Sequence, residues 1–359
     1  MSQKPSVLII SYVPPYNRQG YDLAESLSKA GMKVRLYQMD GVTDEAKKIF
    51  GIKCMRPQGH CHKLQMVLNA WKFLAKTIFA PKQVVICVGR PMLFLGGLYS
   101  ILFGSKLIWY SLEYSHLGKI DKFVYKYLVK GYIDVEENRK NAIFAEYGGK
   151  KHFLVCHNMP HLHDKPIVGR RLRQYLKENY GLDEAVKLVV YAGSYQKYAC
   201  LECIIEASRS FADDLKLILM TFALPDKLNE KSSNCFVVPP VRGEEFYEWL
   251  ADADVALLPY ESMGDFNVLN CSPQKLFDCY VVGVPYVASD RPLVRDMLVR
   301  YEEAGCVCDF KDGNDIRSKI DGMINCKSHV TANMRNLHLT EFNYGRNEAV
   351  LLNLVVGVS

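Results

Sequence analysis

The sequence has no apolar run long enough to cross a membrane. Its longest, from Pro91 to Gly104, has 14 residues, whereas a spanning helix needs roughly 20, so we expect a buried helix there. The first apolar run, Val7–Val13, is too short for a signal peptide and lacks both a basic segment and a cleavage site. These two absences predict a cytoplasmic protein that is soluble or peripheral on a membrane.

The twelve cysteines have no regular spacing that would indicate a disulfide framework. Cys200 and Cys203 form an isolated C-x-x-C without the second pair of ligands that a zinc site needs. The one D-x-D, Asp252-Ala253-Asp254, runs from a helix end into an apolar strand, which indicates a structural turn. We therefore expect reduced thiols and no bound metal.

Also missing is a G-x-G-x-x-G after an opening strand, which disfavours a dinucleotide-dependent dehydrogenase.

Charge is unevenly distributed. Residues 1–163 hold 23 Lys and Arg against 11 Asp and Glu, a net of +12, and the remainder holds 22 against 28, a net of −6. The basic half is expected to meet an anionic surface. No recognisable nucleic-acid-binding motif accompanies the charge, so nucleic acid is not the expected partner.

What the chain does contain is two successive series of apolar strands separated by helix-length segments, with 49% hydrophobic residues to fill the cores. This alternation predicts an α/β fold whose parallel sheets are covered by helices on both faces. The expected strands of the first series are Ser6–Tyr12, Lys33–Gln38, Val84–Val88, Lys106–Ser111, Ile133–Val135 and His152–Cys156. Its expected helices are Tyr21–Ala30, Leu64–Phe79, Met92–Phe103, Lys119–Lys130 and Glu136–Tyr147. The second series has expected strands at Lys187–Gly193, Lys216–Met220, Cys235–Val238, Asp254–Pro259 and Val284–Ser289, with a helix at Leu201–Ser210.

The segment His157–Pro166 is rich in His and Pro and interrupts this pattern, so it is the expected linker. We predict two Rossmann-like, doubly wound domains that face each other across a cleft, at residues 1–160 and 161–340. The tail Phe342–Val356 is apolar on one helical face. Residues 341–359 are therefore predicted to form a helix that packs back on the first domain.

The most informative segment is NCSPQKLFDCYVVGVPYVASD, from Asn270 to Asp290. Ser272 fits a helix N-cap, Pro273 fits the first helical position, and Gly283 fits the end of the helix before another strand. The apolar strand Asp254–Tyr260 lies upstream. In such a layout the N–H groups of the helix start point at a ligand beyond the strand ends, and they suit a phosphate or pyrophosphate. A purely structural helix start has the same pattern.

Three segments of the second half carry a resemblance, and they are Tyr191–Tyr198 (YAGSYQKY), Pro239–Tyr260 (PPVRGEEFYEWLADADVALLPY) and Ser272–Asp290 (SPQKLFDCYVVGVPYVASD). In this order they resemble the donor loop, nucleotide-contacting region and signature helix of the retaining glycosyltransferases of the GT-B class, family four in particular. The resemblance implies transfer of a sugar from a UDP- or GDP-linked donor, without cofactor or metal. The implied acceptor is a glycan or a lipid-linked glycan in cell-surface polysaccharide synthesis.

The resemblance places donor binding in the second domain. Lys197 and Arg242 are the expected catalytic cations, because they would stabilise charge that develops on the leaving diphosphate. Lys197 can instead be a solvated loop lysine, and Arg242 can pair with Glu244 or Glu245. The expected donor-binding residues are Gly193, Ser194, Lys197, Arg242, Asn270, Cys271, Ser272, Pro273, Gln274 and Asp278.

Within that set, Asp278 is expected to accept hydrogen bonds from the ribose hydroxyls. The family pattern has two glutamates separated by seven residues, and this chain has Asn270 and Asp278 at those positions. Asp278 keeps a carboxylate on a shorter arm. Asn270 lacks the charge that the resembling enzymes direct at the donor sugar, which leaves open the sugar and, to a lesser degree, the activity itself.

The first half matches the family less well. The loop Val13–Gly20 stands where paired glycines are usual, and Ile108–His116 stands where an Asp, a His and a Glu are usual. Of the second group only Glu113 is kept, and we expect it to position the acceptor hydroxyl as a catalytic residue. The expected acceptor-side residues are Arg18, Gly20, Glu113 and His116.

Basic and aromatic residues alternate along two predicted helices. The lysines of the first are Lys119, Lys122, Lys126 and Lys130, interleaved with Phe123, Tyr127 and Leu128, and the second has Lys72 and Lys76 beside Trp71 and Phe73. A basic aromatic helix can lie on an anionic membrane, and we predict such a surface as a partner. The simpler alternative is a solvated helix face.

Two other functions remain open at this stage. A nucleotide-sugar 2-epimerase has the same two-domain layout but needs catalytic carboxylates and a histidine near the sugar, which Leu112 and Asn270 do not supply. A non-catalytic partner that keeps the fold and binds a transferase or glycan is the other alternative.

Overall fold

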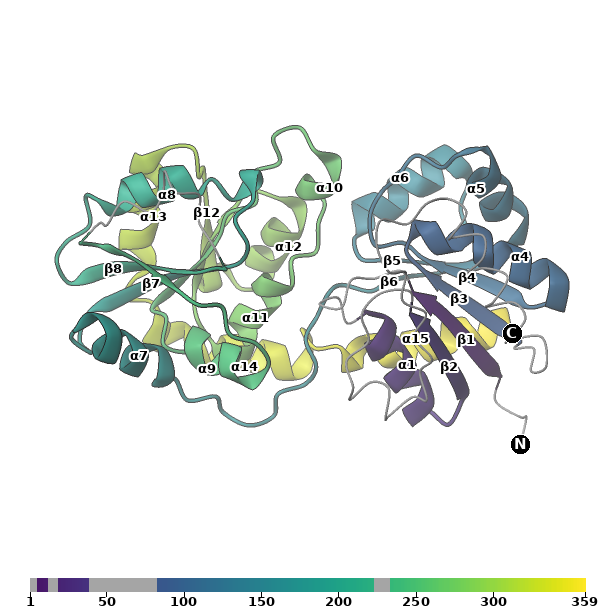
Figure 1. Ribbon diagram of the computed structural model, residues 1–359, viewed down its shortest axis with the longest axis horizontal. Coiled ribbons are helices and arrows are strands. Elements are labelled where there is room, and N and C mark those ends of the chain that lie inside the picture. The colour runs from purple at the N-terminus through teal and green to yellow at the C-terminus, as the bar shows by residue number, and fades with distance from the viewer. Residues whose placement is uncertain (1–4, 12–18, 39–82, 223–232) are drawn as a thin grey trace. The chain divides into compact units, whose positions relative to one another are not determined.

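The computed structural model describes residues 5–11, 19–38, 83–222 and 233–359. They form two compact units (Figure 1). Unit 1 comprises Met1–His157 together with Arg346–Ser359, and unit 2 comprises Asn158–Gly345. Each unit contains a six-stranded sheet in which every pair of neighbouring strands is parallel.

The sheet of unit 1 has the strand order β2-β1-β3-β4-β5-β6. Its strands are β1 (Ser6–Ser11), β2 (Lys33–Gln38), β3 (Val84–Val88), β4 (Lys106–Tyr110), β5 (Val129–Asp134) and β6 (His152–Val155). Its helical elements are α1 (Gln19–Lys29), η1 (Arg90–Met92), α4 (Leu93–Phe103), α5 (Lys119–Phe123), the π-helical turn η2 (Val124–Leu128), α6 (Glu137–Tyr147) and α15 (Gly345–Val358). The inner strands β1, β3, β4 and β5 are buried nearly throughout, as expected for a parallel sheet covered on both faces, whereas the edge strands β2 and β6 are partly exposed.

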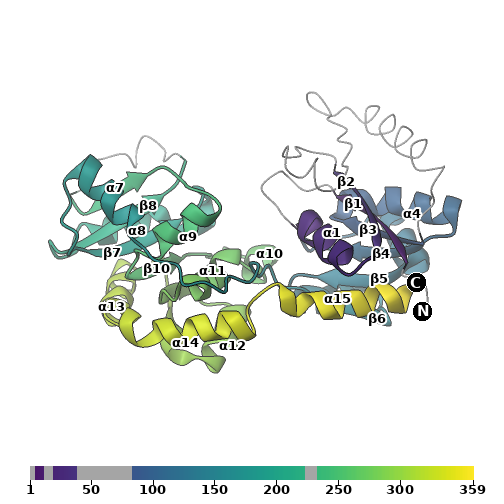
Figure 2. The ribbon, with the colours of Figure 1, turned by 90° about the horizontal axis from the view of Figure 1, so that it is seen from below.

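The last helix, α15, packs on the sheet of unit 1. Gly131 of β5 makes this possible, because a Cβ atom built there would lie 3.1 Å from the Val358 side chain and 3.5 Å from that of Leu354. Ser26 of α1 also donates a 2.7 Å hydrogen bond to Glu348 of α15. Figure 2 shows α15, in yellow, running past β5 and β6.

The sheet of unit 2 has the order β12-β11-β10-β7-β8-β9. Its strands are β7 (Lys187–Ala192), β8 (Leu215–Met220), β9 (Cys235–Val238), β10 (Val255–Leu258), β11 (Tyr286–Ser289) and β12 (Gly305–Cys308). Its helical elements are α7 (Arg171–Tyr180), η3 (Lys197–Ala199), α8 (Leu201–Ser208), α9 (Glu244–Leu250), α10 (Phe266–Leu269), α11 (Gln274–Val282), α12 (Pro292–Arg300), η5 (Glu302–Ala304), α13 (Gly313–Met323) and α14 (Lys327–Thr340).

Alternate residues of the strands in unit 2 belong to two different cores. Leu188 and Val190 of β7 pack in the core formed with α7, α9, α11 and α14. Val189 and Tyr191 pack in the opposite core, formed with α8 and α13. This is the two-residue periodicity of a strand with both faces covered, and it explains why the predicted strands are continuous apolar runs.

The structure confirms the predicted α/β class and the two doubly wound sheets, with local corrections. The predicted helix Lys119–Lys130 ends at Leu128, and Val129 and Lys130 begin β5, whose predicted bounds Ile133–Val135 were too short. Strand β12 and helix α10 were not predicted. The predicted helix Leu64–Phe79, with its lysines and aromatics, lies outside the described residues. Among the described residues no helix has both the length and the apolar character needed to cross a bilayer.

The C-terminal end of α11 illustrates how tightly unit 2 is packed. Gly283 has φ +71°, and a Cβ built on it would lie 2.8 Å from the carbonyl oxygen and 2.9 Å from the Cα of Thr331 in α14. Gly181 ends α7 with nearly the same backbone angle, φ +69°, and has nothing within 4 Å. A comparison of the two glycines therefore separates the energetic cost of backbone strain from that of steric contact.

We expect Gly181→Ala to lower the free energy of unfolding by about 1 kcal/mol, since only the left-handed backbone strain is added. Gly283→Ala adds overpacking against α14 and is expected to cost a further ~1–3 kcal/mol. Chemical denaturation of the two variants measures the difference. Equal losses would show that α14 moves away at no cost.

Candidate functional site

The carboxyl ends of β7 and β10 lie side by side at the centre of the sheet in unit 2. From β7 the chain proceeds outward to β8 and β9, and it then returns to place β10, β11 and β12 on the other side. Such a reversal of strand order is where open α/β sheets bind ligands, beyond the carboxyl ends of the strands. Gly193 follows β7 directly, Tyr260 lies just beyond β10, and Arg291 lies just beyond β11.

Helix α11 begins at Gln274, one residue later than predicted, and Pro273 occupies the N-cap position without a side-chain cap. Ser272 was predicted to be the cap. Its hydroxyl instead accepts a 3.1 Å hydrogen bond from the Asn158 N–H, and its carbonyl accepts one of 2.8 Å from the Asn158 side chain. The hydroxyl of Ser272 is therefore committed to fixing the chain segment where unit 2 begins.

Lys275, in the first turn of α11, is the residue that the sequence analysis missed. Its amino group lies 5.0 Å from the centre of the Tyr191 ring and 5.5 Å from that of Tyr260. A Cβ built on Gly193 would lie 2.1 Å from the same nitrogen and 2.8 Å from the Tyr191 hydroxyl, so the glycine gives the amino group room beside the end of β7. The amino group forms no ion pair with any described residue. Burial lowers the pKa of Lys275 to about 8, against the smaller opposing effect of Asp278.

Asp278 lies one turn further along α11 and is 3% exposed. Its carboxylate accepts a 3.1 Å hydrogen bond from the hydroxyl of Tyr247 in α9, and the Gln274 side chain also bonds to it. Burial raises the pKa of Asp278 to about 7, although these hydrogen bonds and Lys275 act in the opposite direction. The helix thus carries a lysine and a carboxyl group whose pKa values both lie near neutrality.

Two cations lie close to the ring of Tyr260. Lys275 approaches it at 5.5 Å, and the Arg291 guanidinium lies 5.0 Å from its centre. Tyr198 of η3 stacks on the same residue with a ring separation of 5.5 Å and an interplanar angle of 12°. The Tyr198 carbonyl also accepts a 2.8 Å hydrogen bond from the Glu261 N–H. These contacts join the segment after β7 to the one after β10 and α11.

The two predicted catalytic cations are on the surface. Lys197 is exposed at the start of η3. Arg242 is also exposed, immediately before the N-cap of α9, and its guanidinium lies 5.7 Å from the Phe222 ring. Among the described residues neither forms an ion pair, so the alternative pairing of Arg242 with Glu244 or Glu245 is not seen. Ser194 is exposed as well, and its carbonyl accepts from the Tyr191 hydroxyl at 2.8 Å.

Asn270 and Cys271 belong to the segment between β10 and α11 that also contains α10. Asn270 is buried, and its side-chain amide donates a 3.0 Å hydrogen bond to the carbonyl of Phe266, the first residue of α10. In this conformation the Asn270 amide stabilises α10. Cys271 is partly exposed, and its sulfur lies 3.1 Å from Nη1 of Arg291.

Both carboxylates of the D-x-D are used inside unit 2. Asp252 accepts hydrogen bonds from the Leu172 and Arg173 N–H groups at 2.9 and 3.2 Å and so fixes the start of α7. Asp254 pairs with Arg173 at 2.9 Å and with Lys187 at 3.4 Å. These contacts agree with the structural interpretation of the motif.

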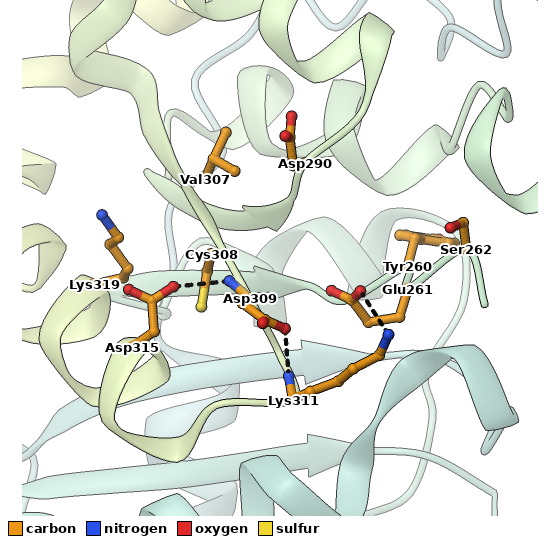
Figure 3. Close-up of a pocket in the computed structure, with 10 residues that line it drawn as sticks. All are labelled: Tyr260, Glu261, Ser262, Asp290, Val307, Cys308, Asp309, Lys311, Asp315 and Lys319. Atoms are coloured by element: carbon orange, nitrogen blue, oxygen red, sulfur yellow. Dashed lines mark hydrogen bonds and ion pairs between the residues drawn. The ribbon is translucent and has the colours of Figure 1, made fainter. Parts of the chain in front are cut away.

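A cavity of about 400 Å³ lies beside Tyr260, and Figure 3 shows the side chains around the cavity. Its lining residues are Tyr260, Glu261, Ser262, Asp290, Val307, Cys308, Asp309, Lys311, Asp315 and Lys319. The carboxylates of Asp309 and Asp315 accept from backbone N–H groups at 2.9 and 2.8 Å. Glu261 accepts from the Ser289 hydroxyl at 2.9 Å. The cavity is therefore walled by β12, α13 and the segments after β10, β11 and β12, and these three acidic groups of its wall are already hydrogen-bonded.

The predicted acceptor-side residues belong to unit 1. Glu113 is exposed in the loop after β4. His116 is exposed in the same loop and lies 3.3 Å from the carboxylate of Glu146 in α6. Gly20 is buried in the first turn of α1, where a Cβ would lie 3.0 Å from the Ser11 hydroxyl, so it packs the helix on the end of β1. Arg18 lies outside the described residues.

No protein-family model and no curated protein sequence matches the chain. Solved structures do match over nearly its whole length. A glycosyltransferase from Rickettsia africae superposes with a TM-score of 0.74 at 11% identity, covering 98% of both chains. HepE of Anabaena, in complex with UDP and glucose, gives 0.72 at 12% identity over 98% of this chain and all of HepE. The chain has the GT-B fold.

A third similar structure has a different printed activity. The UDP-GlcNAc 2-epimerase from Neisseria meningitidis, bound to UDP-GlcNAc, gives a TM-score of 0.60 at 10% identity over 98% of this chain and all of the epimerase. The GT-B fold is thus shared by a transferase and an isomerase at similar sequence distance from this chain.

The raised pKa of Asp278 predicts a pH-dependent stability. The folded protein keeps this proton up to about pH 7, while the unfolded chain releases it near pH 4. The stabilisation from the protonated group is therefore complete below about pH 4 and is lost as the pH rises to 7, by up to about 1.4 kcal/mol per pH unit. In Asp278→Asn this loss should disappear, so the variant should gain stability relative to wild type between pH 4.5 and 7. Urea unfolding at several pH values measures the gain.

Asp213→Asn is the matched control, since Asp213 is an exposed aspartate of the same unit. Its stability difference from wild type should stay constant over this pH range. A constant difference for Asp278→Asn as well would contradict the protonation of Asp278 in the folded state.

Proposed function

We propose that the chain is a retaining glycosyltransferase that moves a sugar from a UDP- or GDP-linked donor to a glycan or lipid-linked acceptor. The observation that carries the proposal is the position of the Lys275 amino group, which lies at the start of α11 beside Gly193 and forms no ion pair with a described residue. A cation at this end of a parallel sheet, next to a helix start, suits a diphosphate. The GT-B fold and the UDP bound by HepE support the same assignment.

In this proposal Lys275 and the first N–H groups of α11 bind the diphosphate, with Lys197 and Arg242 reaching it from their exposed loops. Asp278 binds the ribose hydroxyls, which take the place of the exposed Gln274 side chain as its hydrogen-bond partners. An anionic ligand raises the pKa of Lys275 from about 8, so the lysine is fully protonated when the donor is bound.

The chemistry then needs little acid–base help from the protein. The bond between the anomeric carbon and the diphosphate oxygen breaks, the acceptor oxygen bonds to the same carbon on the same face, and the acceptor proton passes to the leaving phosphate. The cations lower the barrier by stabilising the negative charge on that phosphate, and one such contact is worth roughly 3 kcal/mol. No metal enters this scheme. Glu113, with His116 of the same loop, orients the acceptor.

A surface of unit 1 supports a membrane-borne acceptor. Ile120, Phe123 and Tyr127, on α5 and η2, are 61%, 53% and 55% exposed. Lys119, Lys122 and Lys126 are exposed on the same elements, and Lys130 is exposed at the start of β5. Large exposed apolar side chains among lysines suit the interface of an anionic bilayer. We therefore place the protein on the cytoplasmic face of a membrane, in cell-surface polysaccharide synthesis.

Two alternatives have specific support. The epimerase likeness favours a nucleotide-sugar 2-epimerase, which would convert the donor without any acceptor. The engagement of Asn270 with α10 favours a non-catalytic subunit that binds the donor without turnover. Product analysis with and without lipid extract separates all three, because only the transferase consumes the donor in an acceptor-dependent way.

Isothermal titration with UDP, GDP and their glucose conjugates tests donor binding. Lys275→Met should weaken binding of the preferred ligand at least about 10-fold, since it removes a charged contact to the diphosphate. Lys177→Met is the control, because Lys177 is an exposed lysine of α7 paired with Glu184, and it should bind like wild type. Absence of heat with every nucleotide would overturn the proposal.

Flotation with vesicles tests the membrane surface. Replacing Ile120 and Phe123 together by serine should reduce binding to vesicles containing phosphatidylglycerol about 10-fold or more, because it removes buried apolar area worth at least 1.4 kcal/mol. Val299→Ser removes an 88% exposed valine from unit 2 and serves as the control. Binding that is unchanged in the double variant would exclude this surface.

A further inference from the structure

Arg291 is a buried cation without a matching carboxylate. It is 2% exposed. Its Nη1 donates to the carbonyl oxygens of Val268 and Leu269 and to the Cys271 sulfur, which is 3.1 Å away. Its Nε and Nη2 have no hydrogen-bond partner, and no described carboxylate forms an ion pair with it. A buried charge that lacks an ionic partner costs several kcal/mol, so an anion close to Arg291 would relieve a large penalty.

The atom best placed to become that anion is the Cys271 sulfur. Cys271 is partly exposed and lies three residues before α11, whose first turn holds Lys275. Four groups that interact with it are Arg291 from the segment after β11, at hydrogen-bond distance, and, electrostatically, Lys275 from α11, Tyr260 from the segment after β10 and Tyr198 from η3. None of these four carries a negative charge at neutral pH, and two carry a positive one; the carboxylate of Glu261 also acts on Arg291, but it forms no ion pair with it and accepts a hydrogen bond from the Ser289 hydroxyl. Such surroundings favour a thiolate over a thiol.

We propose that Cys271 is a reactive thiolate paired with Arg291 and that it is a site of covalent modification by small electrophiles, peroxides above all. With a peroxide, the sulfur lone pair attacks one oxygen, an S–O bond forms as the O–O bond breaks, and the leaving hydroxide takes a proton from water. Cysteine is oxidised to sulfenic acid and the peroxide is reduced. A small electrophile is required, because the sulfur is only partly exposed.

Modification of Cys271 places an oxygen or a larger group at the entrance of α11, close to Lys275. If the proposed function holds, this group occupies space needed by the donor diphosphate, and the site becomes redox-sensitive. That consequence rests on the proposed function, while the reactivity of Cys271 does not.

The reactivity is measured on the wild-type protein with iodoacetamide at pH 6 to 9, followed by mass spectrometry of each cysteine-containing peptide. The sulfur forms a bond to carbon and iodide leaves, so the rate reports the thiolate fraction. Cys203, a partly exposed cysteine of α8 in the same unit, is the internal control. At pH 6 we expect Cys271 to react at least ~10-fold faster than Cys203, with a rate that changes little between pH 6 and 8. Parallel pH profiles, or an unlabelled Cys271, would overturn the proposal.

Variants at position 291 identify the charge responsible. Arg291→Lys keeps a cation and should retain most of the reactivity of Cys271 at pH 6, whereas Arg291→Met should reduce it to that of Cys203. Cys271→Ser confirms the assignment of the labelled peptide. If Arg291→Met does not fold, the wild-type pH profile still decides the question. Loss of reactivity in both position-291 variants, with folding intact, would contradict a role for the charge.

UDP separates this inference from the proposed function. Protection of Cys271 by UDP supports both. Fast labelling of Cys271 with no UDP protection and no UDP binding retains the reactive thiolate and removes the transferase assignment. If UDP binds but Cys271 reacts no faster than Cys203, the transferase assignment is retained and the reactive thiolate is removed.

Discussion

The site in unit 2 depends on two positive charges held close to one tyrosine ring. Lys275 and Arg291 approach Tyr260 at 5.5 and 5.0 Å, and neither forms an ion pair with a described carboxylate. Cation–π contacts return about 0.5–2 kcal/mol each, which is less than the several kcal/mol that burial of such charges costs. The folded unit therefore has a local deficit of negative charge at the carboxyl ends of its central strands. Gly193, after β7, leaves room for the Lys275 amino group, and Tyr198 stacks on Tyr260.

The fold could be predicted from the sequence because parallel strands buried on both faces are continuous apolar runs. Val84–Val88 and Cys235–Val238 were predicted with the bounds that the structure has. β12, with the sequence GCVC, was missed because a four-residue strand of small residues carries almost no periodic signal. The end of α5 and η2 was misplaced because Val129 and Lys130 continue a helical pattern that the pairing with β4 overrides.

The site was less predictable, and the reason is that polar side chains near α11 have partners that are distant in sequence. Ser272 has the ideal chemistry of an N-cap, but Asn158, 114 residues away, uses its hydroxyl. Asn270 bonds to Phe266 in a helix too short to recognise. Lys275 carried one usable signal, since a cation in the first turn of a helix opposes the helix dipole and calls for a reason. Arg291 carried none, because the segment that contains α10 covers it, through Val268, Leu269 and Cys271.

The assignment of α15 to unit 1 has a consequence for biosynthesis. Unit 2 is one continuous stretch, Asn158–Gly345, whereas unit 1 needs its final helix to cover β5 at Gly131. On the ribosome, unit 2 can complete its core before the polypeptide is finished, while the earlier-made sheet of unit 1 waits with an uncovered strip of apolar surface. The synthesis of α15 is then the event that lets unit 1 close, so the sheet that is made first is completed only after all of unit 2 has been made.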